Sequence, residues 1–434
     1  MNKKILRLAI PNIVSNITVP LLGLADMALM GHMGNPVYIG AIALGGVLFN
    51  IIYWSFAFLR MGTSGFTAQA YGESNQAAAI TTLARALFVA LIASLLVIAL
   101  QVPIEWLSFE LIQGSNEVEA LAASYFRIRI WAAPATISIF ALTGWFLGMQ
   151  NARIPMYVAI LVNLINLGAN FLFIFAFGMK SDGVALGTVV AQYSGLLFSL
   201  LMLKRHYGNL LPLIRRKALF ELESMTQFFK VNSDIFIRTL CIIAVFTFFT
   251  SRSAASNDTL LAVNSLLLQF LMFYSYFIDG FAYAGEALVG KYVGARKPDQ
   301  LKKVIRYLFI WGSVLTFLYS IVYLTANENI IRLLTNSREV IEASIPYLPW
   351  VVAIPIVGTA SYLWDGIYIG ATASKGMLYS MLGATFLVFF PVYFIMNQQL
   401  GNHALWLAMI LFMGSRGLFQ TLLARKYVFR KYFG

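Results

Sequence analysis

The sequence predicts an all-α polytopic membrane protein with twelve transmembrane helices in two six-helix lobes. Three observations support this prediction. Hydrophobic residues make up 60% of the chain and charged residues only 11%, whereas ordinary soluble domains have roughly 25% charged residues. The mean hydropathy is +0.77, and apolar stretches of membrane-spanning length recur from end to end. Finally, short motifs repeat between the two halves at one constant offset.

Hydropathy and turn signals place six spans in each half. The first span starts after Lys3 and Lys4, lacks a clear small-residue cleavage site and is too long for a signal-peptide core, so we interpret it as a retained helix. The spans of the first half cover residues 5–31, 40–70, 78–103, 120–149, 154–177 and 183–204. Those of the second half cover 227–250, 259–291, 303–326, 340–371, 376–397 and 402–425. The predicted domains are an N-terminal lobe (1–205), a basic cytoplasmic linker (206–223) and a C-terminal lobe (224–434).

The two halves are related by an internal repeat. Gly144 and Gly148 in the fourth span match Gly366 and Gly370 in the tenth, each 222 positions later. The same offset relates Tyr157 to Tyr379 and Gly72 to Gly294. Six spans per repeat is an even number, so both halves insert with the same orientation. A pseudo-twofold axis along the membrane normal is therefore expected, as in transporters built from parallel repeats.

The net charge of +13 reflects membrane topology rather than nucleic-acid binding. Basic residues concentrate in alternate loops, including the N-terminus, residues 204–217, residues 291–306 and the C-terminus. This positive-inside pattern predicts a multi-pass protein with both termini in the cytoplasm. Contact with anionic membrane lipids is an expected side effect.

Asp26 is the main candidate for ion coupling. It is the only acid between Arg7 and Arg60, and apolar residues surround it in the sequence. Placing a carboxylate in hydrocarbon costs about 2.5–3.5 kcal/mol or more of free energy. Such a residue therefore faces water or a partner, or is used as a proton or sodium carrier. The alternative is a hydrogen-bonded structural residue near the outer end of the helix. Pro11 and Pro20 each remove a helical hydrogen bond, so this helix can bend.

A polar stripe lies on the fifth span. Asn163, Asn166 and Asn170 are spaced to share one helix face. Such a face must contact protein or water rather than lipid, so these amides could bind an ion, bond to Asp26 or hold helices together. Thr188 in the sixth span could join the same pocket.

The second half carries a different set of buried charges. At the repeat offset Asp26 corresponds to Phe248, Arg60 to Ala282, Ser64 to Glu286 and Thr143 to Asp365. This asymmetry suggests a division of labour between the lobes. Asp234 and Arg238 are four residues apart and can pair within one helix. Asp279, Glu286 and Asp365 could line a cation pathway or pair with Arg60 and Arg238; the sequence does not distinguish substrate contacts from structural charges.

The chain contains no pattern of an enzyme. It has no nucleotide-phosphate loop, no HExxH or CxxC motif and no recognisable nucleophile–base spacing. A single cysteine, Cys241, makes an intrachain disulfide impossible and a metal cluster unexpected. We therefore expect no cofactor. An active transporter without an ATP-binding motif implies an ion gradient as the energy source.

Several segments resemble the multidrug and toxic compound extrusion (MATE) transporter family, in particular its DNA-damage-inducible F (DinF) branch. The resemblance covers essentially the whole chain. The segments are 8–16 (LAIPNIVSN), 24–32 (LADMALMGH), 59–65 (LRMGTSG), 234–239 (DIFIRT), 279–290 (DGFAYAGEALVG) and 364–370 (WDGIYIG).

The resemblance implies an antiporter of the bacterial inner membrane that exports lipophilic, often cationic, organic compounds. The coupling acid of the family matches Asp26, its bend in the first helix matches Pro11, and its span-five amide and span-six hydroxyl match Asn166 and Thr188. Related members often carry an acid where this chain has Asn170. A pocket with a single carboxylate favours a proton over sodium, although sodium at Asp26 remains the alternative. We expect a monomer that acts on amphipathic small molecules.

Three alternatives are weighed against this one. A purely structural membrane protein does not account for buried charges that are specific to one lobe. A flippase for lipid-linked sugars, from the same superfamily, would require a basic central groove for pyrophosphate, and mid-membrane Arg and Lys are scarce here. A membrane enzyme would require a polar catalytic cluster near one interface, and the sequence contains none.

Overall fold

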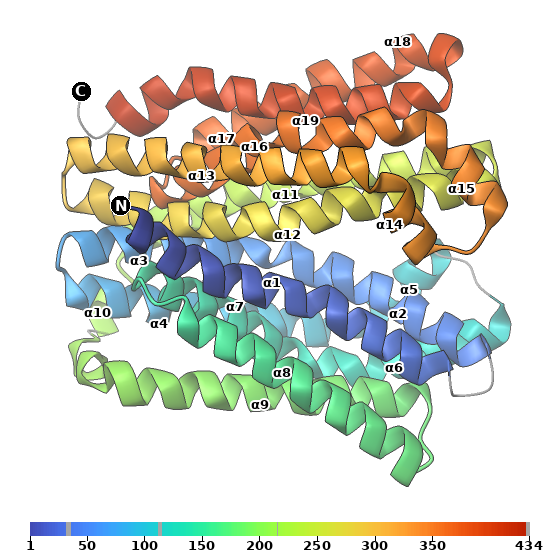
Figure 1. Ribbon diagram of the computed structural model, residues 1–434. Coiled ribbons are helices and arrows are strands. Elements are labelled where there is room, and N and C mark those ends of the chain that lie inside the picture. Colours follow the sequence, from blue (N-terminus) through green and yellow to red (C-terminus); the bar gives the residue numbers. More distant parts are fainter. Residues whose placement is uncertain (32–35, 112–114, 215, 431–434) are drawn as a thin grey trace. The chain divides into compact units, whose positions relative to one another are not determined.

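The computed structural model describes residues 1–31, 36–111, 115–214 and 216–430, with the side chains of 24–31, 36, 39, 111, 216 and 217 left out of the description. Every regular element in this part of the chain is helical (Figure 1). Twelve helical segments are long and apolar enough to cross a membrane. The predicted all-α class and the twelve spans are therefore confirmed.

The first half of the chain contains the first six of these spans. Its α-helices are α1 (Asn2–Gly31), α2 (Pro36–Ser55), α3 (Ala57–Gly72), α4 (Gln76–Ala99), α5 (Gln101–Leu111), α6 (Asn116–Arg129), α7 (Ala133–Gly148), α8 (Arg153–Phe171), α9 (Ser181–Tyr207) and α10 (Arg216–Leu219). Short 3-10 segments cover Ile130–Ala132 and Gly208–Leu213, and a π-helical segment covers Leu172–Ala176.

The second half contains the other six spans. Its α-helices are α11 (Leu222–Ser256), α12 (Asp258–Gly294), α13 (Pro298–Thr325), α14 (Asn327–Leu334), α15 (Arg338–Ser344), α16 (Leu348–Gly370), α17 (Ser374–Leu382), α18 (Phe390–Leu400) and α19 (Asn402–Ala424). A 3-10 segment covers Ile345–Tyr347, and π-helical segments cover Gly383–Phe389 and Arg425–Phe429.

Some predicted spans consist of two helices. The fourth, predicted over 120–149, is α6 followed by a 3-10 turn and α7, because Pro134 in the first turn of α7 lacks the N–H that would continue the helix. The third, predicted to reach residue 103, ends at Ala99 and is followed directly by α5. A sliding hydropathy window does not detect such breaks, because it averages over the residues on both sides.

The described chain divides into two compact units. The N-terminal unit comprises Val14–Phe228, and the C-terminal unit comprises Met1–Ile13 together with Phe229–Gly434. The start of α1 thus packs with the second half: a Cβ added to Gly280 of α12 would lie 2.3 Å from Cγ1 of Ile13. No signal in the sequence assigns the first thirteen residues to that half.

The connection between the halves packs on the N-terminal unit. Arg85 of α4 donates from Nε to the carbonyl of Leu219 at 3.2 Å, and from Nη2 to the carbonyl of Ala218. The rings of Phe88 and Phe220 also meet edge to face, with their centroids 5.3 Å apart. These contacts explain why this unit extends to Phe228.

Close helix packing repeats in the two units. A Cβ added to Gly144 of α7 would lie 2.2 Å from the carbonyl oxygen of Arg60 in α3. A Cβ added to Gly366 of α16 would lie 2.1 Å from the carbonyl oxygen of Ala282 in α12. Arg60 and Ala282 are themselves 222 positions apart. The glycine repeat seen in the sequence is therefore a repeat of backbone contacts.

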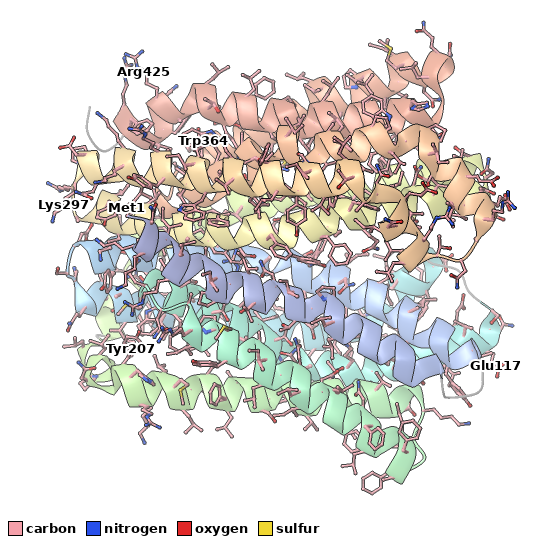
Figure 2. The ribbon with its side chains drawn as sticks, viewed as in Figure 1. Met1, Glu117, Tyr207, Lys297, Trp364 and Arg425 are labelled. Carbon is pink, nitrogen blue, oxygen red and sulfur yellow. The ribbon has the colours of Figure 1, made fainter. Side chains whose placement is uncertain are left out.

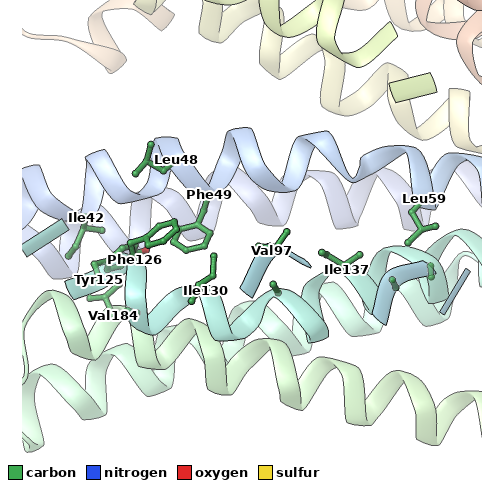
Figure 3. Close-up of a cluster of buried hydrophobic side chains, with 14 of the residues drawn as sticks. Ile42, Leu48, Phe49, Leu59, Val97, Tyr125, Phe126, Ile130, Ile137 and Val184 are labelled. Carbon is green, nitrogen blue, oxygen red and sulfur yellow. The ribbon is translucent and has the colours of Figure 1, made fainter. Parts of the chain in front are cut away.

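An aromatic core fills the N-terminal unit between α2 and α6. Phe49 lies against Phe126, with ring centroids 5.3 Å apart, and Tyr125 is buried beside them (Figure 3). Ile42, Ile130 and Val184 belong to the same cluster. This packing joins α2 and α6 to α9, the helix that carries part of the candidate site.

Candidate functional site

The predicted polar stripe on α8 is buried within the N-terminal unit. Asn166 and Asn170 are 4% and 1% exposed, whereas Asn163 is half-buried. Nδ2 of Asn170 donates to Oδ1 of Asn166 at 3.1 Å, and Nδ2 of Asn166 donates to Oγ1 of Thr188 at 3.2 Å. The Thr188 hydroxyl donates in turn to the carbonyl of Val184 at 3.1 Å. Asn166, Asn170 and Thr188 are thus brought together, and we call these three residues the amide network.

The amide network depends on a close approach of α8 and α9. A Cβ added to Gly187 of α9 would lie only 2.0 Å from Oδ1 of Asn170. Glycine therefore lets the two backbones approach until the amides of one helix reach the hydroxyl of the other. A π-helical segment begins at Leu172, two residues after Asn170. Such segments are frequent at functional sites.

Asp26 belongs to helix α1, but its side chain lies outside the described residues. Its expected role in coupling therefore stays a prediction. Pro11 and Pro20 both lie within α1, which is assigned as one helix from Asn2 to Gly31. Pro11 is buried and Pro20 is half-buried.

Asp365 is the centre of a buried charge cluster in the C-terminal unit. Nη2 of Arg238 in α11 and Nη2 of Arg416 in α19 both donate to its Oδ2, the latter at 2.7 Å. Nε2 of Gln420 donates to its Oδ1 at 2.6 Å. All four residues are at most 7% exposed. We call this group the Asp365 cluster; it joins α11, α16 and α19.

The interpretation of Asp234 and Arg238 as an intrahelical pair is wrong. Arg238 pairs with Asp365, and Asp234 accepts a hydrogen bond from Oγ of Ser374 at 2.6 Å. The spacing allowed both arrangements, but each side chain has a polar partner on another helix. Of the pairings left open by the sequence, the structure thus contains Asp365 with Arg238.

The other predicted charges lie on the glycine-packed helices. Glu286 on α12 is fully buried, and a Cβ added to Gly370 would lie 2.5 Å from its carbonyl oxygen. Arg60 on α3 and Asp279 on α12 are half-buried. All three take part in polar or electrostatic contacts.

Sequence reasoning missed two members of the Asp365 cluster, Arg416 and Gln420. A signal was present, since both interrupt the apolar last span four residues apart and so share a helix face. Their common partner was not predictable, because Asp365 lies on a different span.

The described residues contain no group of three or more His, Cys, Asp or Glu side chains placed to hold a metal ion. The amide network itself consists of two neutral amides and one hydroxyl. These groups exchange hydrogen bonds with a carboxyl group in either protonation state.

Comparison with known proteins gives consistent matches over most of the chain. A family model described as MatE matches residues 11–172 and 235–395, one range in each half. The chain is 38% identical over 423 residues to the DNA damage-inducible protein F of Escherichia coli strain K12, covering 96% of this chain and 90% of that one. It is 25% identical over 438 residues to the probable multidrug resistance protein NorM of Thermotoga maritima, covering 94% and 89%.

Solved structures share the fold. A transporter of the MOP superfamily from Pyrococcus furiosus superposes with a TM-score of 0.84 at 20% sequence identity, over 98% of this chain and 95% of that one. At this identity the similarity concerns the arrangement of helices.

Proposed function

The chain belongs to the MatE family, whose members are membrane transporters rather than enzymes, and we propose that it is a cation-coupled antiporter exporting lipophilic, often cationic, organic compounds. The DinF protein of Escherichia coli is a homologue over nearly its whole length. We further propose that the chain resides in a bacterial inner membrane with both termini in the cytoplasm, acts as a monomer and is driven by protons through Asp26.

The observation that carries the proposal is the amide network. Its hydrogen bonds run in one direction, from Asn170 through Asn166 and Thr188 to the carbonyl of Val184. Oδ1 of Asn166 and Oγ1 of Thr188 each already accept a hydrogen bond. The side-chain nitrogen of Asn166 has a second N–H besides the one that it donates to Thr188, and a carboxylate would accept such a donor.

A change in the protonation of Asp26 would alter this network. An ionised carboxylate accepts hydrogen bonds only, whereas a protonated one also donates. Protonation of Asp26 would therefore change which amide N–H groups donate hydrogen bonds. It would also neutralise a negative charge in an apolar helix. Because Pro11 and Pro20 weaken α1, that change would bend the helix and alter the substrate pocket.

Sodium is the alternative coupling ion. It would require several oxygen ligands around one carboxylate, and two oxygens of the amide network already accept hydrogen bonds. Each of these two oxygens therefore has one lone pair fewer to offer to sodium, and we propose the proton as the coupling ion. The flippase alternative finds no support in the two buried arginines of the C-terminal unit, since Arg238 and Arg416 are both bonded to Asp365.

Transport in reconstituted vesicles tests the proposal. The full chain is reconstituted, a proton or a sodium gradient is imposed separately, and export of the lipophilic cation ethidium is followed by fluorescence. We expect the proton gradient alone to drive transport, and Asp26→Asn to reduce it to the level of empty vesicles. Asp299→Asn, at an exposed acid in the first turn of α13, is the matched control and should transport normally. Sodium-driven transport, or full activity of Asp26→Asn, would contradict proton coupling.

Thr188→Val separates a functional network from structural helix packing. Loss of one interhelical hydrogen bond in a membrane protein costs about 0.6 kcal/mol on average, so the variant should fold nearly as well as the wild type. We expect its proton-driven transport to fall sharply and that of Thr188→Ser, which keeps the hydroxyl, to recover. If transport follows only the amount of folded protein, the network is structural.

A further inference from the structure

A surface groove lies on the C-terminal unit between α13, α16 and α19. Its volume is about 660 Å³, within the roughly 300–1,000 Å³ of typical ligand pockets. The lining residues are Ile305, Arg306, Phe309, Ile310, Ser313, Val314, Trp364 and Thr421. These positions lie on membrane-spanning helices.

The wall of the groove presents an apolar surface. Ile310 and Val314 are both 45% exposed along α13. The polar atoms of the floor are bonded within the protein: Nε1 of Trp364 donates to Oγ1 of Thr421 at 2.8 Å, and that hydroxyl donates to the carbonyl of Gly417 at 2.7 Å. Hydrocarbon can therefore lie against the floor of the groove without stranding these polar atoms.

One end of the groove is basic. Arg306 lines it, Lys302 lies one turn earlier on α13, and Arg425 lies one turn beyond Thr421. All three side chains are exposed, and none has an acidic partner in the described part of the chain. Figure 2 places Arg425 and Lys297, which directly precedes α13, at the same end of the C-terminal unit.

The dimensions match one leaflet of a bilayer. Eight residues separate Arg306 from Val314, which corresponds to about 12 Å along the helix. The hydrocarbon depth of one leaflet is about 15 Å, half of the roughly 30 Å core. A chain lying in the groove would therefore start at the basic end and run toward the bilayer centre.

We propose that this groove binds one anionic phospholipid, with its phosphate near Arg306 and Arg425 and an acyl chain along Ile310, Val314 and Trp364. Basic pockets between transmembrane helices recognise anionic headgroups in this way. Lys302 adds charge at the same end. None of its lining residues belongs to the amide network or to the Asp365 cluster, although Trp364 and Thr421 are sequence neighbours of Asp365 and Gln420.

Lipid titration of the purified full chain tests the proposal. Native mass spectrometry compares phosphatidylglycerol with phosphatidylcholine carrying the same acyl chains. We expect the first phosphatidylglycerol to bind more tightly than phosphatidylcholine. The double variant Arg306→Gln/Arg425→Gln should weaken phosphatidylglycerol binding about thirtyfold, since each basic residue near an anionic surface contributes about 1 kcal/mol. Its phosphatidylcholine binding should be unchanged.

A second pair with the same loss of charge is the control. Lys297→Gln/Lys426→Gln removes two exposed basic residues at the same end but off the groove faces, and should retain the preference. Equal binding of both lipids by the wild type would overturn the proposal. An equal loss in the control pair would also overturn it. Nonspecific electrostatic attraction between the basic end and the anionic lipid would then explain the preference.

A bulky substitution in the groove tests separately whether the acyl chain of the lipid lies there. Ser313→Phe places a ring in the groove at an exposed position, so folding should be preserved. We expect it to weaken phosphatidylglycerol binding, whereas Val322→Phe, at an exposed position on the opposite face of α13, should not. Undiminished binding in Ser313→Phe would show that the chain does not lie in the groove.

Discussion

Asp365 illustrates at the scale of single residues how a buried charge is tolerated. Its two oxygens accept hydrogen bonds from Arg238, Arg416 and Gln420, which come from two other helices. Two guanidinium groups on one carboxylate leave a net positive charge in this cluster. Removing the carboxylate would therefore leave two buried cations without their shared partner, which is costlier than removing the whole cluster.

We predict that Asp365→Leu destabilises the protein by about 3–5 kcal/mol, as is typical when one partner of a buried ion pair is removed. Thermal unfolding in detergent measures the effect. The triple variant Arg238→Met/Asp365→Leu/Arg416→Met should recover most of the stability, because no unpaired charge remains.

Glu328→Gln is the matched control for this prediction. It breaks the exposed pair with Arg332, whose atoms are 2.7 Å apart, and should cost at most about 0.5 kcal/mol. If Asp365→Leu is as mild as this control, the cluster is not a structural centre of the C-terminal unit.

At the scale of helices, two glycine contacts hold each unit together. Gly144 and Gly148 of α7 face α3, and Gly366 and Gly370 of α16 face α12. Any larger side chain would meet a backbone atom, which cannot move aside as a flexible side chain can. Small residues allow this close approach, and close packing is a main source of helix association within a membrane.

We predict that Gly366→Ala and Gly144→Ala each destabilise the protein by about 1–3 kcal/mol or more, because the added methyl group overpacks the contact. Gly46→Ala and Gly168→Ala are matched controls, since nothing lies within 4 Å of a Cβ at either position. They should be neutral or stabilising by up to about 1 kcal/mol, as expected for Gly→Ala within a helix. Similar unfolding temperatures for both pairs would contradict the packing argument.

At the scale of the whole molecule, the alternation of basic loops predicts the orientation in the membrane. The loop before α13 carries Arg296 and Lys297, whereas α6 begins with the acids Glu117 and Glu119. The positive-inside rule places the first region in the cytoplasm and the second outside.

Cysteine labelling in whole cells checks this orientation. Cys241 is the only cysteine and is buried, so Cys241→Ala provides a background without reactive thiols. We expect a membrane-impermeant maleimide to label Glu117→Cys in intact cells and Lys297→Cys only after permeabilisation. The opposite pattern would place both termini outside.

Much of the candidate site was predictable because it depends on spacing within one helix. Asn166 and Asn170 are four residues apart, and helical geometry alone places them on one face. Contacts between helices were less predictable. Asp234 and Arg238 have the same spacing, yet each bonds to another helix, and Arg416 was not recognised as a partner of Asp365.

The sequence by itself determined the helical class, the twelve spans and the repeat. Each span must be apolar over about 20 residues, which leaves a strong compositional signal. Within hydrocarbon each span must also make its own backbone hydrogen bonds, which requires a helix. It also identified Asp26 and the amide stripe as costly polar groups in apolar helices. Only the tertiary structure decided which side chains meet across helices: Asn166 with Thr188, Asp365 with Arg238 and Arg416, and the start of α1 with the C-terminal unit. The physical reason is that partners on separate helices are chosen by packing, and packing depends on close approaches such as that at Gly187, which no spacing along the chain encodes.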